Sequence, residues 1–228
     1  MAKNDSAPCL MTTSIIKKFV MSISGLMLVM FLLFHMSMNL VAVFSEEGYN
    51  MICEFLGANW YALVGTLGLA AGFVIHIILA IVLTLQNRRA RGSVRYAIEV
   101  RPKEVDWASK NMLVLGVIVL GFLALHFAQF WYKMQFAELI GTQTGEYGAA
   151  DGIAYIKLYF SQPLYCIIYL VWLVALWFHL THGFWSAFQT IGWNGKTWFP
   201  RLKCISNVIA TIIVLGFAVV PVYFFIFQ

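Results

Sequence analysis

Five long runs without a charged residue dominate this sequence of 228 residues. They occupy residues 19–44, 60–87, 111–132, 163–191 and 205–227, and every carboxylate, lysine and arginine lies outside them. A helix of about 20 apolar residues crosses the hydrocarbon core of a bilayer. Because little chain remains between the runs, the sequence predicts a single membrane domain over residues 1–228. The predicted fold is an all-α bundle of five transmembrane helices.

Composition excludes most other classes of protein. Only 11% of the residues are charged, against about 25% in a soluble domain. The first apolar run has 26 residues and no small-residue cleavage site behind it, whereas the apolar core of a signal peptide has about 7–15 residues. We therefore expect it to be a retained helix. The four cysteines lack C-x-x-C spacing, so no c-type haem attachment, zinc site or iron–sulfur site is indicated.

The basic residues divide unequally between the two ends of the predicted bundle. With a cytoplasmic N-terminus, 13 of the 15 lysines and arginines fall in cytoplasmic segments, and only Lys133 and Lys157 lie outside. Cytoplasmic loops carry an excess of such residues. We therefore expect a multi-pass protein of the inner (cytoplasmic) membrane, with its N-terminus cytoplasmic and its C-terminus outside. The net charge of +5 then indicates a basic face that binds anionic lipid or docks a soluble subunit, and no nucleic acid.

Histidine occurs in four of the five spans and nowhere else: His35, His76, His126, and the close pair His179 and His182. An ionisable side chain inside the membrane is costly and usually functional. At 1.5 Å per helical residue, His35 and His126 share a level nearer the outside. His76 and His179 share a level nearer the cytoplasm. The spacing predicts two layers, each with histidines from two helices.

Two imidazoles that face each other can hold a six-coordinate haem iron, the arrangement used for electron transfer. Zinc or copper usually requires three or four clustered ligands, and a proton relay usually includes carboxylates, which these spans lack. The pattern therefore predicts two bis-histidine haems. His179 and His182 lie on one side of their helix, so one is the ligand and the other bonds a propionate, a quinone or a carbonyl. Depth alone does not choose between them.

Local motifs accompany this pattern. HMSMNL at residues 35–40 leads to GYN at 48–50, and the fourth span reads FHLTHGFWSAFQTIGW at 178–193. With the helix count, the topology and the four histidine-bearing helices, the whole chain resembles the cytochrome b membrane anchor of succinate dehydrogenase and fumarate reductase. The resemblance is to the five-helix, single-polypeptide, dihaem type. In that family a glycine follows the fourth-helix ligand by four residues, which here implies His179 and Gly183.

The resemblance implies the remaining functional features. The metal ligands would be His76 with His179 on the cytoplasmic side and His35 with His126 on the outer side, holding two haems b. A flavoprotein subunit with FAD and an iron–sulfur subunit would dock on the cytoplasmic face, and such complexes can pair as dimers. Electrons would pass between these subunits and a membrane quinone, menaquinone in this type, as in a respiratory chain. This chain would hold no catalytic residue for succinate or fumarate.

Several assignments remain open in the sequence. The candidate quinone contacts are Asn39, Gln129, Trp131 and Glu54, and the candidate propionate contacts are Ser22, Ser24, Arg88 and Arg89. Gly65, Gly68 and Gly72 in the second span either admit a neighbouring helix or make room for a macrocycle. Residues 88–110 form a charged connection in which a short surface helix is expected. Two rival functions are a cytochrome b subunit of a membrane hydrogenase or formate dehydrogenase, and a transporter or proton channel with structural histidines.

Overall fold

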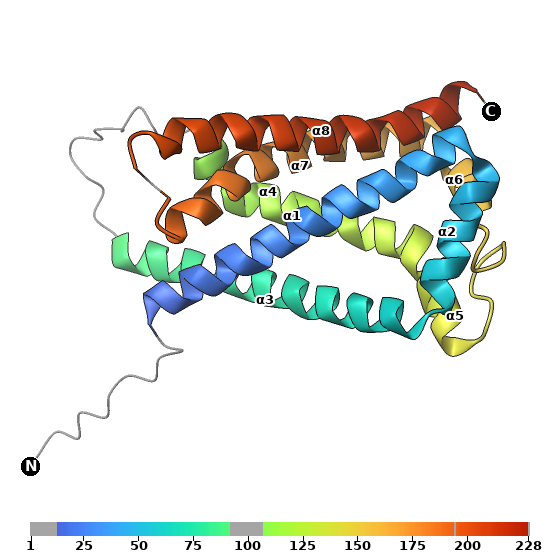
Figure 1. Ribbon diagram of the computed structural model, residues 1–228, viewed down its shortest axis with the longest axis horizontal. Coiled ribbons are helices and arrows are strands. Elements are labelled where there is room, and N and C mark those ends of the chain that lie inside the picture. Colours follow the sequence, from blue (N-terminus) through green and yellow to red (C-terminus); the bar gives the residue numbers. More distant parts are fainter. Residues whose placement is uncertain (1–12, 92–106, 194, 228) are drawn as a thin grey trace, which may run out of the picture.

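The computed structural model describes residues 13–91, 107–193 and 195–227, and within them the regular structure is entirely helical (Figure 1). Among these described residues, five helices are long and apolar enough to cross a membrane. They are α1 (Ser14–Phe44), α3 (Trp60–Arg91), α7 (Pro163–Thr190), α8 (Trp198–Ile226), and a continuous rod of α4 (Trp107–His126), the π-helix η2 (Phe127–Phe136) and α5 (Ala137–Ile140). The predicted all-helical architecture with five spans is confirmed.

Several helices extend past the bounds that the uncharged runs predict. Helix α8 begins at Trp198, not near residue 205, and the third rod continues to Ile140, not to 132. Lys203 and Lys133 lie inside these extensions. Long basic side chains can bury their stems and carry the charge to the membrane surface, so a charge does not end the helix. The expected surface helix within residues 88–110 falls mostly outside the described residues.

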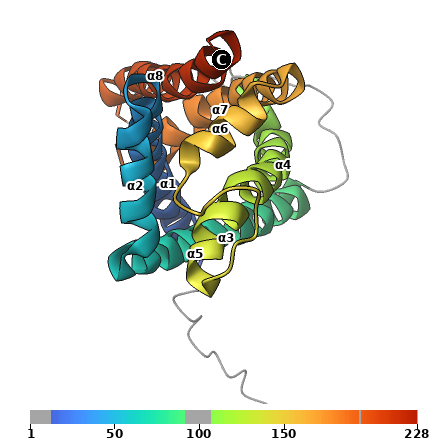
Figure 2. The same cartoon turned by 90° about the vertical axis from the view of Figure 1, so that its right-hand side faces the viewer.

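Helix α7 is the central element of the bundle. It packs against α8, α4 and α1, whereas α3 packs mainly against α1 and has few contacts with α4. The view along the bundle shows this arrangement, with α3 at the opposite side from α8 (Figure 2). Buried apolar side chains of α1, α7 and α8, including Val29, Leu176 and Ile213, form the core between these three helices. The central position of α7 brings its polar residues into the interior.

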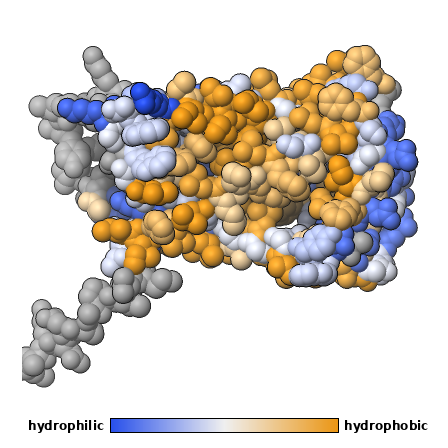
Figure 3. Space-filling model, in the orientation of Figure 1, coloured by the Kyte–Doolittle hydropathy of each residue, from blue (hydrophilic) through white to orange (hydrophobic). Residues whose placement is uncertain are grey.

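The lateral surface of the bundle is apolar. Figure 3 shows hydrophobic side chains over the middle of one face and hydrophilic ones concentrated at the two ends. Large apolar residues such as Leu67, Val171 and Leu215 are about 60% exposed or more. Soluble monomers rarely expose contiguous apolar surface of this extent. The protein is therefore a multi-pass membrane protein whose middle contacts lipid.

Short helices cover one end of the bundle, which we call the α2–α6 end: α2 (Glu46–Ala58), α5, α6 (Gly152–Phe160) and the loop of residues 141–151. Ser45 accepts a hydrogen bond from the Gly48 backbone N–H, and Asp151 accepts one from Ala154. These side chains cap α2 and α6 at their first turns. Neither short helix follows from the apolar runs, because α2 is amphipathic and α6 contains Lys157 and ends before the fourth run begins.

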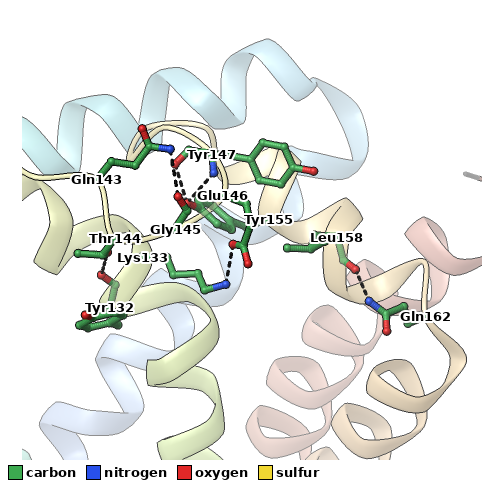
Figure 4. A network of polar contacts seen from close by, with 10 residues as sticks. All are labelled: Tyr132, Lys133, Gln143, Thr144, Gly145, Glu146, Tyr147, Tyr155, Leu158 and Gln162. Carbon is green, nitrogen blue, oxygen red and sulfur yellow. Dashed lines mark hydrogen bonds and ion pairs between the residues drawn. The ribbon is translucent and has the colours of Figure 1, made fainter.

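One ion pair and several hydrogen bonds hold the loop at this end (Figure 4), and a second ion pair joins α6 to α2. Lys133 lies 2.6 Å from Glu146, and Lys157 lies 2.7 Å from Glu46. Tyr155 donates a hydrogen bond of 2.7 Å to the Tyr147 carbonyl. The two basic residues that the sequence assigns to the outer side are thus both neutralised by carboxylates at the same end.

Candidate functional site

His35 of α1 and His126 of α4 lie side by side near the α2–α6 end. Their ring centroids are 5.9 Å apart and the ring planes meet at 80°. Metal–nitrogen bonds of about 2 Å place two imidazoles on opposite sides of one metal ion with centroids about 6 Å apart. The observed separation therefore fits a pair of axial haem ligands, and the two residues come from the spans that the depth count pairs.

The ring of His35 is fixed from three sides. Phe31, one turn earlier, stacks on it at 5.3 Å with an interplanar angle of 12°, and Phe217 of α8 packs at 5.6 Å. The amide nitrogen Nδ2 of Asn39 lies 3.3 Å from His35 Nδ1 and also donates to the His35 carbonyl. Tyr49 of α2 donates to Asn39 Oδ1 at 3.2 Å. Because the Asn39 amide nitrogen is a donor, His35 Nδ1 accepts in this contact, and the proton of the neutral ring lies on Nε2.

The ring of His126 faces a buried pair of polar side chains. The Tyr169 hydroxyl of α7 lies 3.5 Å from His126 Nδ1 and donates a hydrogen bond of 2.8 Å to Gln129 Oε1. Gln129 is the buried residue of the π-helix η2, which begins directly after His126. π-Helical turns are rare and frequently occur at functional sites. Here the unusual turn places an amide next to the candidate ligand.

His76 of α3 contacts the first span through its Nδ1 side. Ser24 Oγ lies 3.4 Å from His76 Nδ1, and the same hydroxyl donates to the Met21 carbonyl. The His76 ring also bonds the Met21 backbone. Gly25 lies flush against the ring, since a Cβ there would come within 3.3 Å of His76 Cε1. The Ser24 hydroxyl donates its proton to the Met21 carbonyl, just as Tyr169 beside His126 donates its proton to Gln129. The Ser24 oxygen can therefore accept a hydrogen bond from His76 Nδ1–H.

His179 of α7 is the fourth-span histidine that the resemblance pairs with His76. It is close enough to His76 and His182 for electrostatic interaction. Its ring lies against α4, because a Cβ on Gly116 would be 3.7 Å from His179 Cε1. Its Nδ1 is buried without a hydrogen-bond partner. His182 instead packs edge-on against Trp185 at 4.8 Å. This placement favours His179 as the partner of His76.

A common pattern runs through the candidate ligands. His35, His76 and His126 each meet a polar side chain at Nδ1, respectively Asn39, Ser24 and Tyr169. Metal-bound imidazoles typically use one nitrogen for the metal and donate the other N–H to a nearby acceptor, which orients the ring. The arrangement at His76 and His126 fits that requirement. The separation of His35 and His126 and the Nδ1 contacts of His76 and His126 therefore suit haem ligation, whereas Asn39 presents a donor to His35 Nδ1 and His179 Nδ1 has no partner. The ligand roles themselves stay a prediction.

The other candidate residues are more dispersed. Ser22 bonds the carbonyl of Lys18 in its own helix, and Trp131 packs against Phe127 and Phe136 at the surface. Arg88 and Arg89 are exposed near the end of α3. These positions leave the propionate and quinone roles predicted for them untested.

Glu54 lines an open depression of about 780 Å³ at the α2–α6 end, between α2, α5 and the loop. Three further carboxylates line the same depression: Glu47, Glu138 and Asp151. Beside it, burial raises the pKa of the Cys53 thiol in α2 to about 11. Hydrogen bonding to Lys133 lowers the pKa of the exposed Glu146 carboxyl. This end of the bundle is therefore acidic, with a neutral thiol beneath its surface.

The three glycines of α3 differ in their surroundings. A Cβ on Gly72 would collide with the end of the Met27 side chain of α1, whereas a Cβ on Gly65 or Gly68 would meet nothing within 4 Å. Gly72 therefore serves the contact between α1 and α3. Gly65 and Gly68 do not pack against another helix among the described residues, so helix packing within this chain does not explain them.

The histidine pattern and the local motifs of the sequence do not identify Tyr169 as a residue of this site. A weak signal is present, because Tyr169 lies ten residues before His179 in the same helix. At 1.5 Å per residue this places Tyr169 about 15 Å from the His179 level, at the level of the other histidine pair. A depth count applied to every buried polar residue would have found it.

Comparison with known proteins adds no relative. No protein-family model, curated protein or solved structure matches this chain. The functional argument therefore depends on the histidine geometry and on the sequence motifs.

Proposed function

We propose that this chain is the dihaem cytochrome b anchor of a succinate:quinone oxidoreductase, through which electrons pass between an iron–sulfur subunit and a membrane quinone. The observation that carries the proposal is the His35–His126 pair, with ring centroids 5.9 Å apart. Four histidine-bearing spans and the motifs of the sequence support the same assignment. The membrane-spanning helices agree with a role as an anchor.

The proposal assigns a role to each site residue. His35 and His126 hold the outer haem, and His76 and His179 hold the inner one. Haem iron with two imidazole ligands is a one-electron carrier. Around the outer pair, Phe31, Phe217 and other aromatic rings exclude water and keep the imidazoles oriented.

Spectral counting of haem in histidine variants tests the proposal. The purified parent protein should contain two haems b per chain. His35→Ala and His126→Ala should each lose one of them, and His76→Ala and His179→Ala should each lose the other. His182→Ala is the matched control, since it removes an imidazole one turn from His179 and should retain both haems. A parent protein without a Soret band, or four alanine variants with full haem content, would refute the proposal.

Co-purification tests the identity of the complex separately. Gentle solubilisation should recover a flavoprotein with FAD and an iron–sulfur subunit with this chain. Recovery of a molybdenum or nickel–iron catalytic subunit instead would retain the haem assignment and reject the succinate or fumarate partner. The measured activity of the recovered complex, succinate oxidation or fumarate reduction with a quinone, then identifies the reaction.

A further inference from the structure

We infer that Tyr169, held by Gln129, is a positioning residue that orients the His126 imidazole and lowers the potential of the outer haem. This inference rests on the proposed function, because it takes His126 as an axial ligand. It concerns residues to which the sequence motifs give no such role.

The direction of the hydrogen bonds carries the first step. A tyrosine hydroxyl has one proton, and Tyr169 donates it to Gln129 Oε1 at 2.8 Å. The hydroxyl oxygen also lies 3.5 Å from His126 Nδ1, where it can only accept. His126 therefore carries its proton on Nδ1, and the lone pair remains on Nε2. The chain from Nδ1–H through Tyr169 to Gln129 selects the tautomer that can bind iron.

The surroundings keep this chain of hydrogen bonds in place. Tyr169 is 6% exposed and Gln129 is 4% exposed. Phe122 and Phe160 pack edge-on against the Tyr169 ring at 4.6 and 4.9 Å. The hydroxyl therefore cannot turn away from His126 without disturbing a packed aromatic cluster. Tyr169 satisfies Gln129 Oε1 in this buried position, whereas Gln129 Nε2 has no hydrogen-bond partner.

His126 differs from the other candidate ligands in the side chains that reach its Nδ1 atom. The side chain at Nδ1 is Ser24 for His76 and Asn39 for His35, and both belong to α1. Nδ1 of His179 has no hydrogen-bond partner. Only at His126, among the residues described, does a side chain of another span reach Nδ1 with a second buried side chain behind it. An acceptor at the outer nitrogen makes the ligand more basic. A more basic ligand favours ferric over ferrous iron and lowers the potential.

Redox titration of the membrane-bound complex tests the inference with Tyr169→Phe. This variant removes the hydroxyl and keeps the ring. The ratio of reduced to oxidised outer haem at a fixed potential should rise, and a tenfold rise would correspond to a shift of about 59 mV for one electron. The inner haem should not change. Tyr165→Phe is the matched control, because Tyr165 lies one turn away on α7 and packs on Tyr159.

Each outcome has a defined meaning. A rise confined to the outer haem of Tyr169→Phe supports the inference, and a changed low-spin electron paramagnetic resonance signal of that haem supports a reoriented imidazole. An unchanged potential, or an equal shift in Tyr165→Phe, overturns it. If Tyr169→Phe loses the outer haem, Gln129→Leu decides: a rise supports the inference and no change overturns it. An unchanged potential in a protein that holds two haems leaves the proposed function intact, whereas absence of haem from the parent rejects the proposed function itself.

Discussion

Replacing Phe224 with alanine should destabilise the bundle, whereas the same change at the next residue, Phe225, should have little effect. Phe224 is fully buried in the aromatic core of the α2–α6 end, and Phe225 is 44% exposed. In a water-soluble core, Phe→Ala costs about 3–5 kcal/mol. A helix that separates within lipid does not expose its ring to water, so mainly the cavity cost remains. At about 24 cal/mol per Å³, a lost ring of roughly 100 Å³ corresponds to about 2.4 kcal/mol.

Thermal unfolding of the purified protein in detergent measures this difference. For a chain of this size, each kcal/mol shifts Tm by about 2–4 °C, so Phe224→Ala should lower Tm by about 5–10 °C. Phe225→Ala should stay within about 0.5 kcal/mol of the parent. Equal losses of Tm in the two variants would refute the reasoning, because they would show that Phe224 is not more tightly packed than its lipid-facing neighbour.

Three further perturbations follow from the structure. Gly72→Leu should push Met27 aside and cost about 1 kcal/mol, measured as a lower Tm. The pKa of Glu146 is lowered from 4.5 by Lys133, so its contribution to stability is present at neutral pH and is lost as the pH falls below 4.5. The Tm of Glu146→Gln should therefore change less between about pH 6 and pH 3 than that of the parent. With a pKa of about 11, the Cys53 thiol should react slowly with maleimide at pH 8, where about one molecule in a thousand is ionised.

Matched controls accompany these perturbations. Gly68→Leu places the same side chain in open space on α3 and should leave Tm unchanged; a larger loss there than at Gly72 would contradict the packing assignment. Glu138→Gln removes an exposed carboxylate of the same end, and its Tm should keep the pH dependence of the parent. Cys204 is exposed and should react before Cys53 in a Cys9→Ser background. Equal rates would contradict the burial of Cys53.

The architecture follows from the sequence because lipid imposes a simple length rule on each span. Five uncharged runs predict the five long helices, and the depth count brings His35 next to His126. Both predictions depend on the helical rise alone, which varies little. The helix ends are less predictable, since a count of uncharged residues ends the helix of Lys133 too early and begins the helix of Lys203 too late.

Features that depend on packing between elements could not be predicted. The π-helix after His126 has no distinct composition, and it turns Gln129 toward Tyr169 through contacts with α7. Likewise, the G-x-x-x-G pattern suggests one continuous interface, but only Gly72 meets a neighbouring helix. Which of several similar residues faces a partner is set by helix rotation, and the sequence gives only the spacing.

A single unbroken helix at the centre of the bundle has a consequence for the distance between the two histidine levels. Tyr169, at the level of His126, and His179 are both part of α7, ten residues apart. The covalent backbone and its hydrogen bonds fix this interval at about 15 Å. Tilting or sliding of α1 and α3 against α7 would change how well each imidazole pair closes, but it would leave the vertical gap between the pairs almost constant.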